Sequence, residues 1–171
     1  MRLEDIRGIR AMRDIRGIGS AARAALNTAN LSTPLGLALA AAARTPLRRG
    51  PGGLFIAEHY RPRLPAAAAF VVGNVVFTRG RAEDLLARPA LFGHEARHAT
   101  QYAACLGLPF LPLYAVAAAY SAARTGNPGS LNPFEQIAGL EAGGYPRRRT
   151  RPLPPPASTP AGSHRHGVRK P

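Results

Sequence analysis

Three apolar stretches with helical spacing dominate the pattern of hydrophobic and polar positions along the chain. The first covers 35–43, where Thr33 can cap a helix and Pro34 fits its first turn. The second covers 89–105 and is apolar along most of its surface, whereas the third, over 112–123, is apolar on all sides. Because such a helix offers water no polar face, we predict that the third is buried against the second.

Residues rich in β-branched and aromatic side chains fill 68–78. This composition is typical of a β-strand. Gly73 and Asn74 interrupt the stretch, and these residue types mark a bulge or a tight turn. If they form a two-residue turn, the stretch becomes a hairpin with strands at 69–72 and 75–78.

A shorter strand is predicted over 54–60, and a short helix over 82–87 leads into the helix at 89–105. Helices outnumber strands in this pattern. The sequence therefore predicts an α+β fold, mainly helical, with a small β-sheet or hairpin preceding the helix at 89–105.

The two ends of the chain differ from the middle, which predicts one domain over 31–145. Residues 1–30 repeat Asp-Ile-Arg-Gly-Ile with apolar residues at a period of three, which drifts around a helix. We expect a loosely ordered basic extension there, with Met12 as an alternative start to Met1. Residues 146–171 have no apolar period, so we expect a disordered basic tail rich in proline and arginine.

The formal net charge of +14 belongs to these ends. Residues 1–50 carry nine arginines and three acidic residues, a net of +6, and residues 146–171 carry six arginines and one lysine, a net of +7. Residues 51–145 carry seven arginines and six acidic residues, a net of +1. This middle contains no specific nucleic-acid motif. The charge of the two ends instead allows weak contact with a membrane surface, which we keep as a further possible partner.

Cys105 is the only cysteine of the chain, so no intrachain disulfide can form. A chain without disulfides fits a reducing compartment. The sequence therefore predicts a cytoplasmic protein, with peripheral attachment to a membrane as the alternative.

The most informative motif is His94-Glu95-Ala96-Arg97-His98, inside the helix predicted at 89–105. A spacing of four residues puts both imidazoles on one helix face, where they can bind one zinc ion. Glu95 lies beside such a metal and can take a proton from water. Gln101 lies on the same face, and two interpretations of it are open. It hydrogen-bonds one of the metal ligands, or it is an ordinary packed or exposed glutamine.

A zinc site with two histidines needs a third protein ligand. Glu135, on a predicted helix downstream, is the best candidate. Asn132 can cap that helix, and Glu135 three residues later can complete a capping box instead. Glu141 is the competing ligand, nearer the helix C-terminus, where a carboxylate is less favoured.

Together, His94-Glu95-x-x-His98 and Glu135 within Asn-Pro-Phe-Glu-x-x-Ala resemble the gluzincin group of zincin metallopeptidases. More narrowly, 93–101 and 132–145 resemble small actinobacterial proteins with a minimal zincin-like domain.

The resemblance implies that the two histidines and Glu135 bind zinc, with Glu95 as the general base. It also implies an edge strand, matched by 70–78, that pairs with an extended peptide. Zincins often stabilise the oxyanion with a side chain, for which Tyr145 and Tyr102 are the candidates here.

The sequence thus predicts a zinc-dependent, metallopeptidase-like hydrolase with a peptide or protein substrate. A second hypothesis is a catalytically inactive metal-binding or interaction module, tethered to a membrane or nucleic acid by its basic ends. A third is a peripheral membrane protein built on the helices at 35–43 and 112–123.

Overall fold

A computed structural model of the chain describes residues 19–65 and 67–150. The predictions for the repeat within 1–18 and for the tail from 151 onward lie outside these residues. The described elements, in chain order, are α2 (Ser20–Ala29), α3 (Ser32–Ala42), β1 (Leu47–Arg49), the 3-10 turn η3 (Pro51–Gly53), β2 (Phe55–Ala57), β3 (Ala69–Val72), β4 (Val75–Thr78), α4 (Ala82–Leu86), α5 (Pro89–Ala104), α6 (Phe110–Thr125) and α7 (Pro133–Ala138).

A small four-stranded sheet runs in the order β1-β2-β4-β3. β1 pairs antiparallel with β2, β2 pairs parallel with β4, and β3 pairs antiparallel with β4. Of the two structures that the sequence allowed for 68–78, the hairpin is right, with Gly73 and Asn74 between its strands. Among the described residues no strand pairs with the outer side of β3, so this strand is a free edge.

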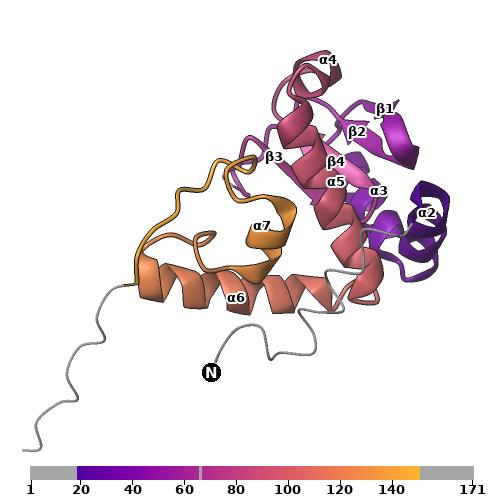
Figure 1. Ribbon diagram of the computed structural model, residues 1–171. Coiled ribbons are helices and arrows are strands. Elements are labelled where there is room, and N and C mark those ends of the chain that lie inside the picture. The colour runs from indigo at the N-terminus through magenta and orange to yellow at the C-terminus, as the bar shows by residue number, and fades with distance from the viewer. Residues whose placement is uncertain (1–18, 66, 151–171) are drawn as a thin grey trace, which may run out of the picture.

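Helices surround the sheet, and the fold is α+β as the sequence predicts. Figure 1 shows α5 lying across the sheet, with α7 between α5 and α6. Side chains from the central strands, including Ile56, Val76 and Phe77, are fully buried. Phe77 stacks on Phe70 of the neighbouring strand, with ring centroids 4.7 Å apart. The core therefore sits between the sheet and the helix that carries the histidine motif.

The segment 20–29 corrects the prediction of a loosely ordered extension over 1–30, because it forms the helix α2. Its Asn27 is fully buried. The Asn27 amide donates to the Ala99 carbonyl on α5 at 2.8 Å and to the Asn74 side chain in the hairpin turn at 3.0 Å. One side chain thus joins α2, α5 and the β3–β4 turn.

The hairpin turn itself is fixed by a close approach to α3. Gly73 has a φ of +60°, and a Cβ there would lie 2.4 Å from the backbone of Ser32. The Thr33 hydroxyl accepts a hydrogen bond from the Asn74 backbone N–H at 3.2 Å. Only glycine satisfies both the positive φ and the contact, which holds the end of β3 in place.

Helix α6 corrects a second expectation. It is longer than predicted, since it begins at Phe110, and it is not buried on all sides. Only Phe110, Ser121 and Thr125 are buried within it. The apolar residues on its outer side face solvent, because α6 packs along one side only.

We predict that Asn27→Ala lowers the free energy of unfolding by about 2 kcal/mol, because it leaves two buried acceptors, the Ala99 carbonyl and Asn74 Oδ1, without their donor. In a chain of this size the melting temperature should fall by about 4–8 °C. Thermal unfolding followed by circular dichroism measures this. Thr28→Ala, which removes an exposed hydroxyl bonded within α2, is the control. Equal melting temperatures for the two variants would contradict the assignment.

Candidate metal centre

The two motif histidines meet on the inner face of α5. Pro89 starts this helix, and the spacing of His94 and His98 places their rings one turn apart in an edge-to-face arrangement, with centroids 4.6 Å apart and an angle of 86° between the ring planes. Both side chains are buried. Their Nε2 atoms lie 3.0 Å from each other, so both rings direct the same nitrogen to one point.

The outer nitrogen of each ring is held by an oxygen atom. His94 Nδ1 lies 3.1 Å from the Gly139 carbonyl, and His98 Nδ1 lies 2.7 Å from Gln101 Oε1. Gln101 in turn donates its amide to the Phe134 carbonyl at 2.9 Å. Because these oxygens can only accept, Nδ1 of each ring carries the proton. Each Nε2 therefore presents a lone pair, which is the tautomer that binds a metal.

Glu135, at the third position of α7, supplies a carboxylate at the same point. Its Oε2 lies 3.2 Å from His94 Nε2, and its Oε1 lies 3.5 Å from His98 Nε2. The Tyr114 hydroxyl, from α6, donates to Oε1. One ligand atom from each of His94, His98 and Glu135 falls within 4.8 Å of the others.

The donor set fits a divalent cation. Oε2 of Glu135 is buried and receives no hydrogen bond, although His94 Nε2 is near it. This absence agrees with the tautomer, since an unprotonated Nε2 has nothing to donate. Lone pairs of two imidazoles and a carboxylate thus face one another in a buried place, where a cation would stabilise all three. Two nitrogens and one oxygen are a zinc ligand set, and other divalent ions accept it too.

The charges at the centre shift the pKa values of the same groups. Burial opposes ionisation of Glu135, but the imidazoles of His94 and His98, which carry positive charge once protonated, and the Tyr114 hydroxyl outweigh it and lower the pKa of Glu135 to about 2. Burial by itself lowers the pKa of His94, and the Glu135 carboxylate beside it more than reverses this, so that pKa is raised. Without a metal, a proton shared with Glu135 compensates the carboxylate.

Glu95 lies next to this centre without taking part in it. Its side chain is buried, and no hydrogen bond to its carboxylate occurs within the described ranges. Burial, with a smaller contribution from the Glu135 charge, raises the pKa of Glu95. A carboxylate in this condition is a stronger base than one in water.

Both the centre and Glu95 open into a cavity of about 580 Å³. Apart from the centre its walls are apolar, aromatic or backbone. The residues 67–72 line it without a break. Since neighbouring side chains of a strand point to opposite faces, an unbroken run means that the cavity runs along the free edge of β3. The other lining residues are Leu39, Pro65, Leu91, Tyr102, Phe110, Leu111, Tyr114, Gly143, Gly144 and Tyr145.

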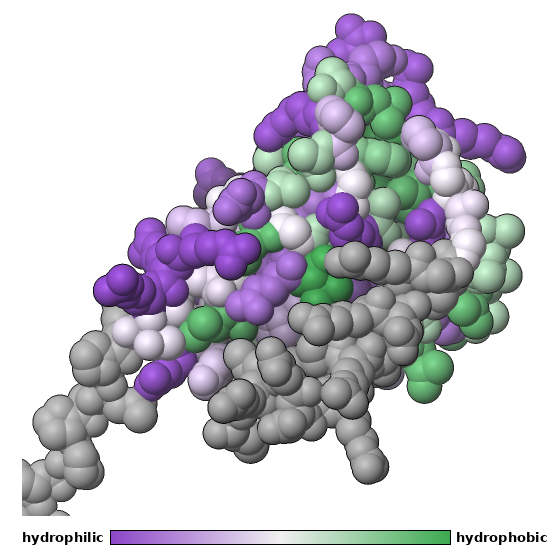
Figure 2. Space-filling view, viewed as in Figure 1, coloured by the Kyte–Doolittle hydropathy of each residue, from purple (hydrophilic) through white to green (hydrophobic). Residues whose placement is uncertain are grey.

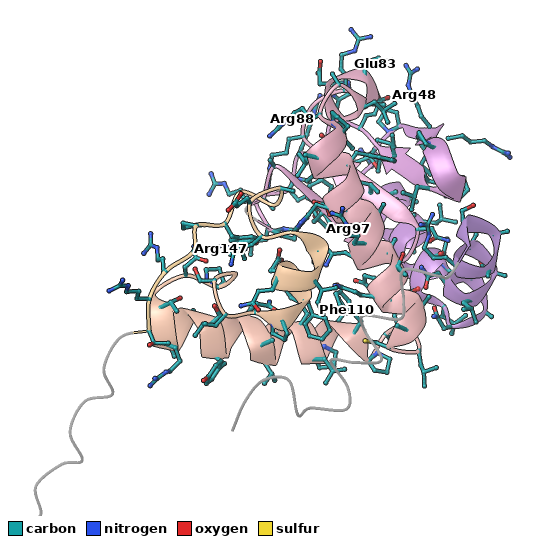
Figure 3. All side chains as sticks on the ribbon, in the orientation of Figure 1. Arg48, Glu83, Arg88, Arg97, Phe110 and Arg147 are labelled. Atoms are coloured by element: carbon teal, nitrogen blue, oxygen red, sulfur yellow. The ribbon has the colours of Figure 1, made fainter. Side chains whose placement is uncertain are left out.

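The segment after α7 folds back over the centre. A Cβ at Gly143 would lie 2.4 Å from the His94 ring, so only glycine lets the chain pass this closely. Tyr145 follows and lines the cavity. Arg97 of α5 donates to the Ala138 carbonyl at 2.7 Å, and Figure 3 shows Arg97 and Phe110 on either side of α7. Contacts on both sides thus fix helix α7 in the position from which Glu135 reaches the two histidines.

Of the two carboxylates proposed as third ligand, the structure brings Glu135 to the histidines and leaves Glu141 exposed, 3.8 Å from Arg147. Asn132 caps α7 by accepting from the Phe134 N–H at 3.0 Å and does not line the cavity. Tyr102 is buried beneath Phe110, with ring centroids 4.4 Å apart.

Tyr114 is the functional residue that sequence reasoning missed. It belongs to a helix that reads as uniformly apolar, so its hydroxyl drew no attention. The sequence does hold one signal for it: Tyr114 follows Phe110 by four residues, which places both side chains on the same, buried side of α6.

Comparisons with known proteins add no family. No family model matches the chain, and no curated protein or solved structure matches it either. The resemblance to zincins therefore rests on the motif residues and on the geometry described above.

We predict that the metal-free protein melts at a higher temperature at pH 6 than at pH 8. The pKa of Glu135 is depressed, so its contribution is complete above its unfolded value of 4.5 and constant in this window. The pKa of His94 is raised above 6.5, so its contribution is present at pH 6 and is lost as the pH rises through the folded pKa. Melting curves in a chelator measure the difference.

Added zinc should reverse this trend, because zinc binds the deprotonated imidazoles and stabilises more at pH 8. His94→Asn should abolish both effects, whereas His59→Asn, at an exposed histidine, should keep them. A metal-free protein that is more stable at pH 8 than at pH 6 would contradict the pairing of protonated His94 with the Glu135 carboxylate.

Proposed function

We propose that the protein is a zinc-dependent hydrolase that cleaves peptide bonds. His94, His98 and Glu135 hold the metal, and Glu95 is the general base. The observation that carries this proposal is the meeting of three buried ligand atoms beside Glu95, with Oε2 of Glu135 receiving no hydrogen bond. Buried polar atoms of a purely structural cluster are normally hydrogen-bonded, and this oxygen is not.

Zinc supplies Lewis-acid chemistry, because it polarises a carbonyl oxygen and makes water more acidic. Glu95 moves the proton. Its raised pKa and its place on the cavity wall suit it to accept a proton from the attacking water and to deliver it to the leaving amine. Gln101 keeps the His98 ring in the metal-binding tautomer through the contact at Nδ1.

The free edge of β3 supports an extended peptide as the substrate. Unpaired N–H and C=O groups along an edge strand can pair with an added strand. Residues 67–72, which include this strand, line the cavity together with the three metal-ligand candidates. A peptide paired with β3 would therefore carry one of its carbonyl groups to the centre, and the apolar walls favour apolar side chains on that peptide.

Tyr145 is assigned to the stabilisation of the oxyanion. Burial, together with the charge of Glu135, raises the pKa of Tyr145, so its hydroxyl keeps its proton at neutral pH. Tyr114 directs its own proton to Glu135. Of the two tyrosines, Tyr145 is thus the donor available to a substrate.

Glu95→Gln tests the general base. It should lower kcat/KM on a quenched-fluorescence peptide library by at least about 100-fold, because the amide cannot accept the proton. Zinc content should remain at the wild-type level, since Glu95 is not a ligand. Glu141→Gln, at an exposed carboxylate of the same type, should change neither quantity. Hydrolysis by Glu95→Gln at the wild-type rate would refute the mechanism.

Tyr145→Phe tests the oxyanion donor. It should lower kcat by about 100-fold while KM changes little, because the hydroxyl acts only when charge develops on the carbonyl oxygen. Tyr120→Phe, at an exposed tyrosine of α6, is the matched control. A change confined to KM would instead assign Tyr145 to substrate binding.

A further inference from the structure

The outer face of α6 and the turn before it form an exposed apolar surface. Five large apolar side chains project from it: Leu106, Leu108, Leu113, Val116 and Tyr120. Leu106 is 78% exposed and Val116 is 70% exposed. We call this set the α6 face. Large exposed apolar patches are rare on monomeric proteins and mark interaction sites.

The α6 face has no charge within it. From His98 to Ala123 the sequence contains no lysine, arginine, aspartate or glutamate. Helix α6 is nevertheless no membrane span, since none of the described helices combines the length and apolar content needed to cross a bilayer. A surface of this kind can lie along an apolar boundary without entering it deeply.

Positive charge lies at one end of this face. Arg124 is in the last turn of α6. The Ser130 hydroxyl donates to the Pro146 carbonyl at 2.7 Å, which fixes the start of 146–150 beside the α6–α7 loop. Figure 2 shows hydrophilic side chains gathered where this segment leaves the fold, and Figure 3 shows Arg147 near the end of α6.

Three consecutive arginines, 147–149, are exposed there. Glu141 is the acidic group near them, and it lies 3.8 Å from Arg147. Arg148 and Arg149 are thus in excess over acidic groups at this end of the helix, and the rest of the chain after 146 adds no acidic residue. The apolar face is therefore flanked by a basic cluster.

We propose that the α6 face docks on the surface of an anionic lipid bilayer. Its leucines, valine and tyrosine would sit among the headgroups and upper acyl chains, and the arginines after Pro146 would contact lipid phosphates and carboxylates. Charge complementarity favours this occupant over a second copy of the chain, because anionic headgroups would compensate the arginines, whereas residues 98–123, which carry the α6 face, contain no acidic residue that could do so.

The proposal does not depend on zinc or on hydrolysis.

The chain contains no tryptophan, so one introduced tryptophan reports directly on this contact. In full-length Val116→Trp, the emission should shift to shorter wavelength with mixed phosphatidylcholine–phosphatidylserine vesicles and not with pure phosphatidylcholine vesicles. Leu64→Trp is the matched control, because Leu64 is 75% exposed on a different part of the surface, and its emission should not shift.

Aspartate at the same two positions tests how much each position contributes to the affinity for the mixed vesicles. Val116→Asp should weaken co-sedimentation with the mixed vesicles at least about fivefold, since it loses an apolar contact and repels anionic lipid. Leu64→Asp changes the charge equally and should weaken it less than about twofold. Far-UV circular dichroism spectra and melting temperatures equal to those of the wild type in both variants would show that the fold is intact.

Three results would overturn the proposal. The first is no binding of the full chain to the mixed vesicles. The second is binding that Val116→Asp and Leu64→Asp weaken equally, which would assign it to the basic tail alone. The third is self-association that depends on protein concentration, measured by size-exclusion chromatography with light scattering, in a chain that does not bind vesicles. If Val116→Asp abolished this self-association, a second copy of the chain would be the occupant of the α6 face.

Discussion

A buried carboxylate facing two imidazoles is the constraint on which the rest of the structure depends. Glu135 is 2% exposed, and burying its charge is costly unless cationic groups compensate it. The surrounding hydrogen bonds orient the two imidazole rings that provide this compensation. Gly139 and Gln101 each hold the outer nitrogen of one ring, so both inner nitrogens face the carboxylate. The centre is therefore built for a positive charge between the rings, whether a proton or a metal ion.

The fold brings this centre together from distant parts of the chain. The histidines come from α5, the carboxylate from α7 and the supporting hydroxyl of Tyr114 from α6. Asn27 anchors α5 to α2 and to the hairpin turn, which sets the free edge of β3 along the same cavity. The fold thus places a candidate metal site, the buried carboxylate of Glu95 and a free strand edge around one cavity.

Local signals were enough to predict the helices that carry the site. Pro89 and Gly107 bound α5, and the four-residue spacing of His94 and His98 requires that their rings share a face. Glu135 was also reachable, because a two-histidine site needs a third ligand. The sequence favoured Glu135 but could not exclude Glu141. That decision depends on the path of the chain after α7, where Gly143 packs on the His94 ring.

Other features depend on contacts that no local pattern records. The short strand β1 was not predicted, because its three residues pair only through the partner strand β2. Helix α2 was missed because its buried side chains, Arg23 and Asn27, are polar, and their burial depends on contacts with Gly52, α5 and the hairpin turn. The exposure of α6 was missed for the opposite reason. A helix that is apolar all round predicts burial, and the sequence does not say that packing covers one side only.

The measurement that tests the central claim most directly is the metal content of the purified full chain, by inductively coupled plasma mass spectrometry, in parallel with Glu135→Ala and Glu141→Ala. The account predicts about one zinc per chain in the wild type and in Glu141→Ala, and almost none in Glu135→Ala, because only Glu135 completes the three-ligand set. A wild type that takes up no metal after refolding with zinc, or a Glu135→Ala variant that retains it, would contradict the account.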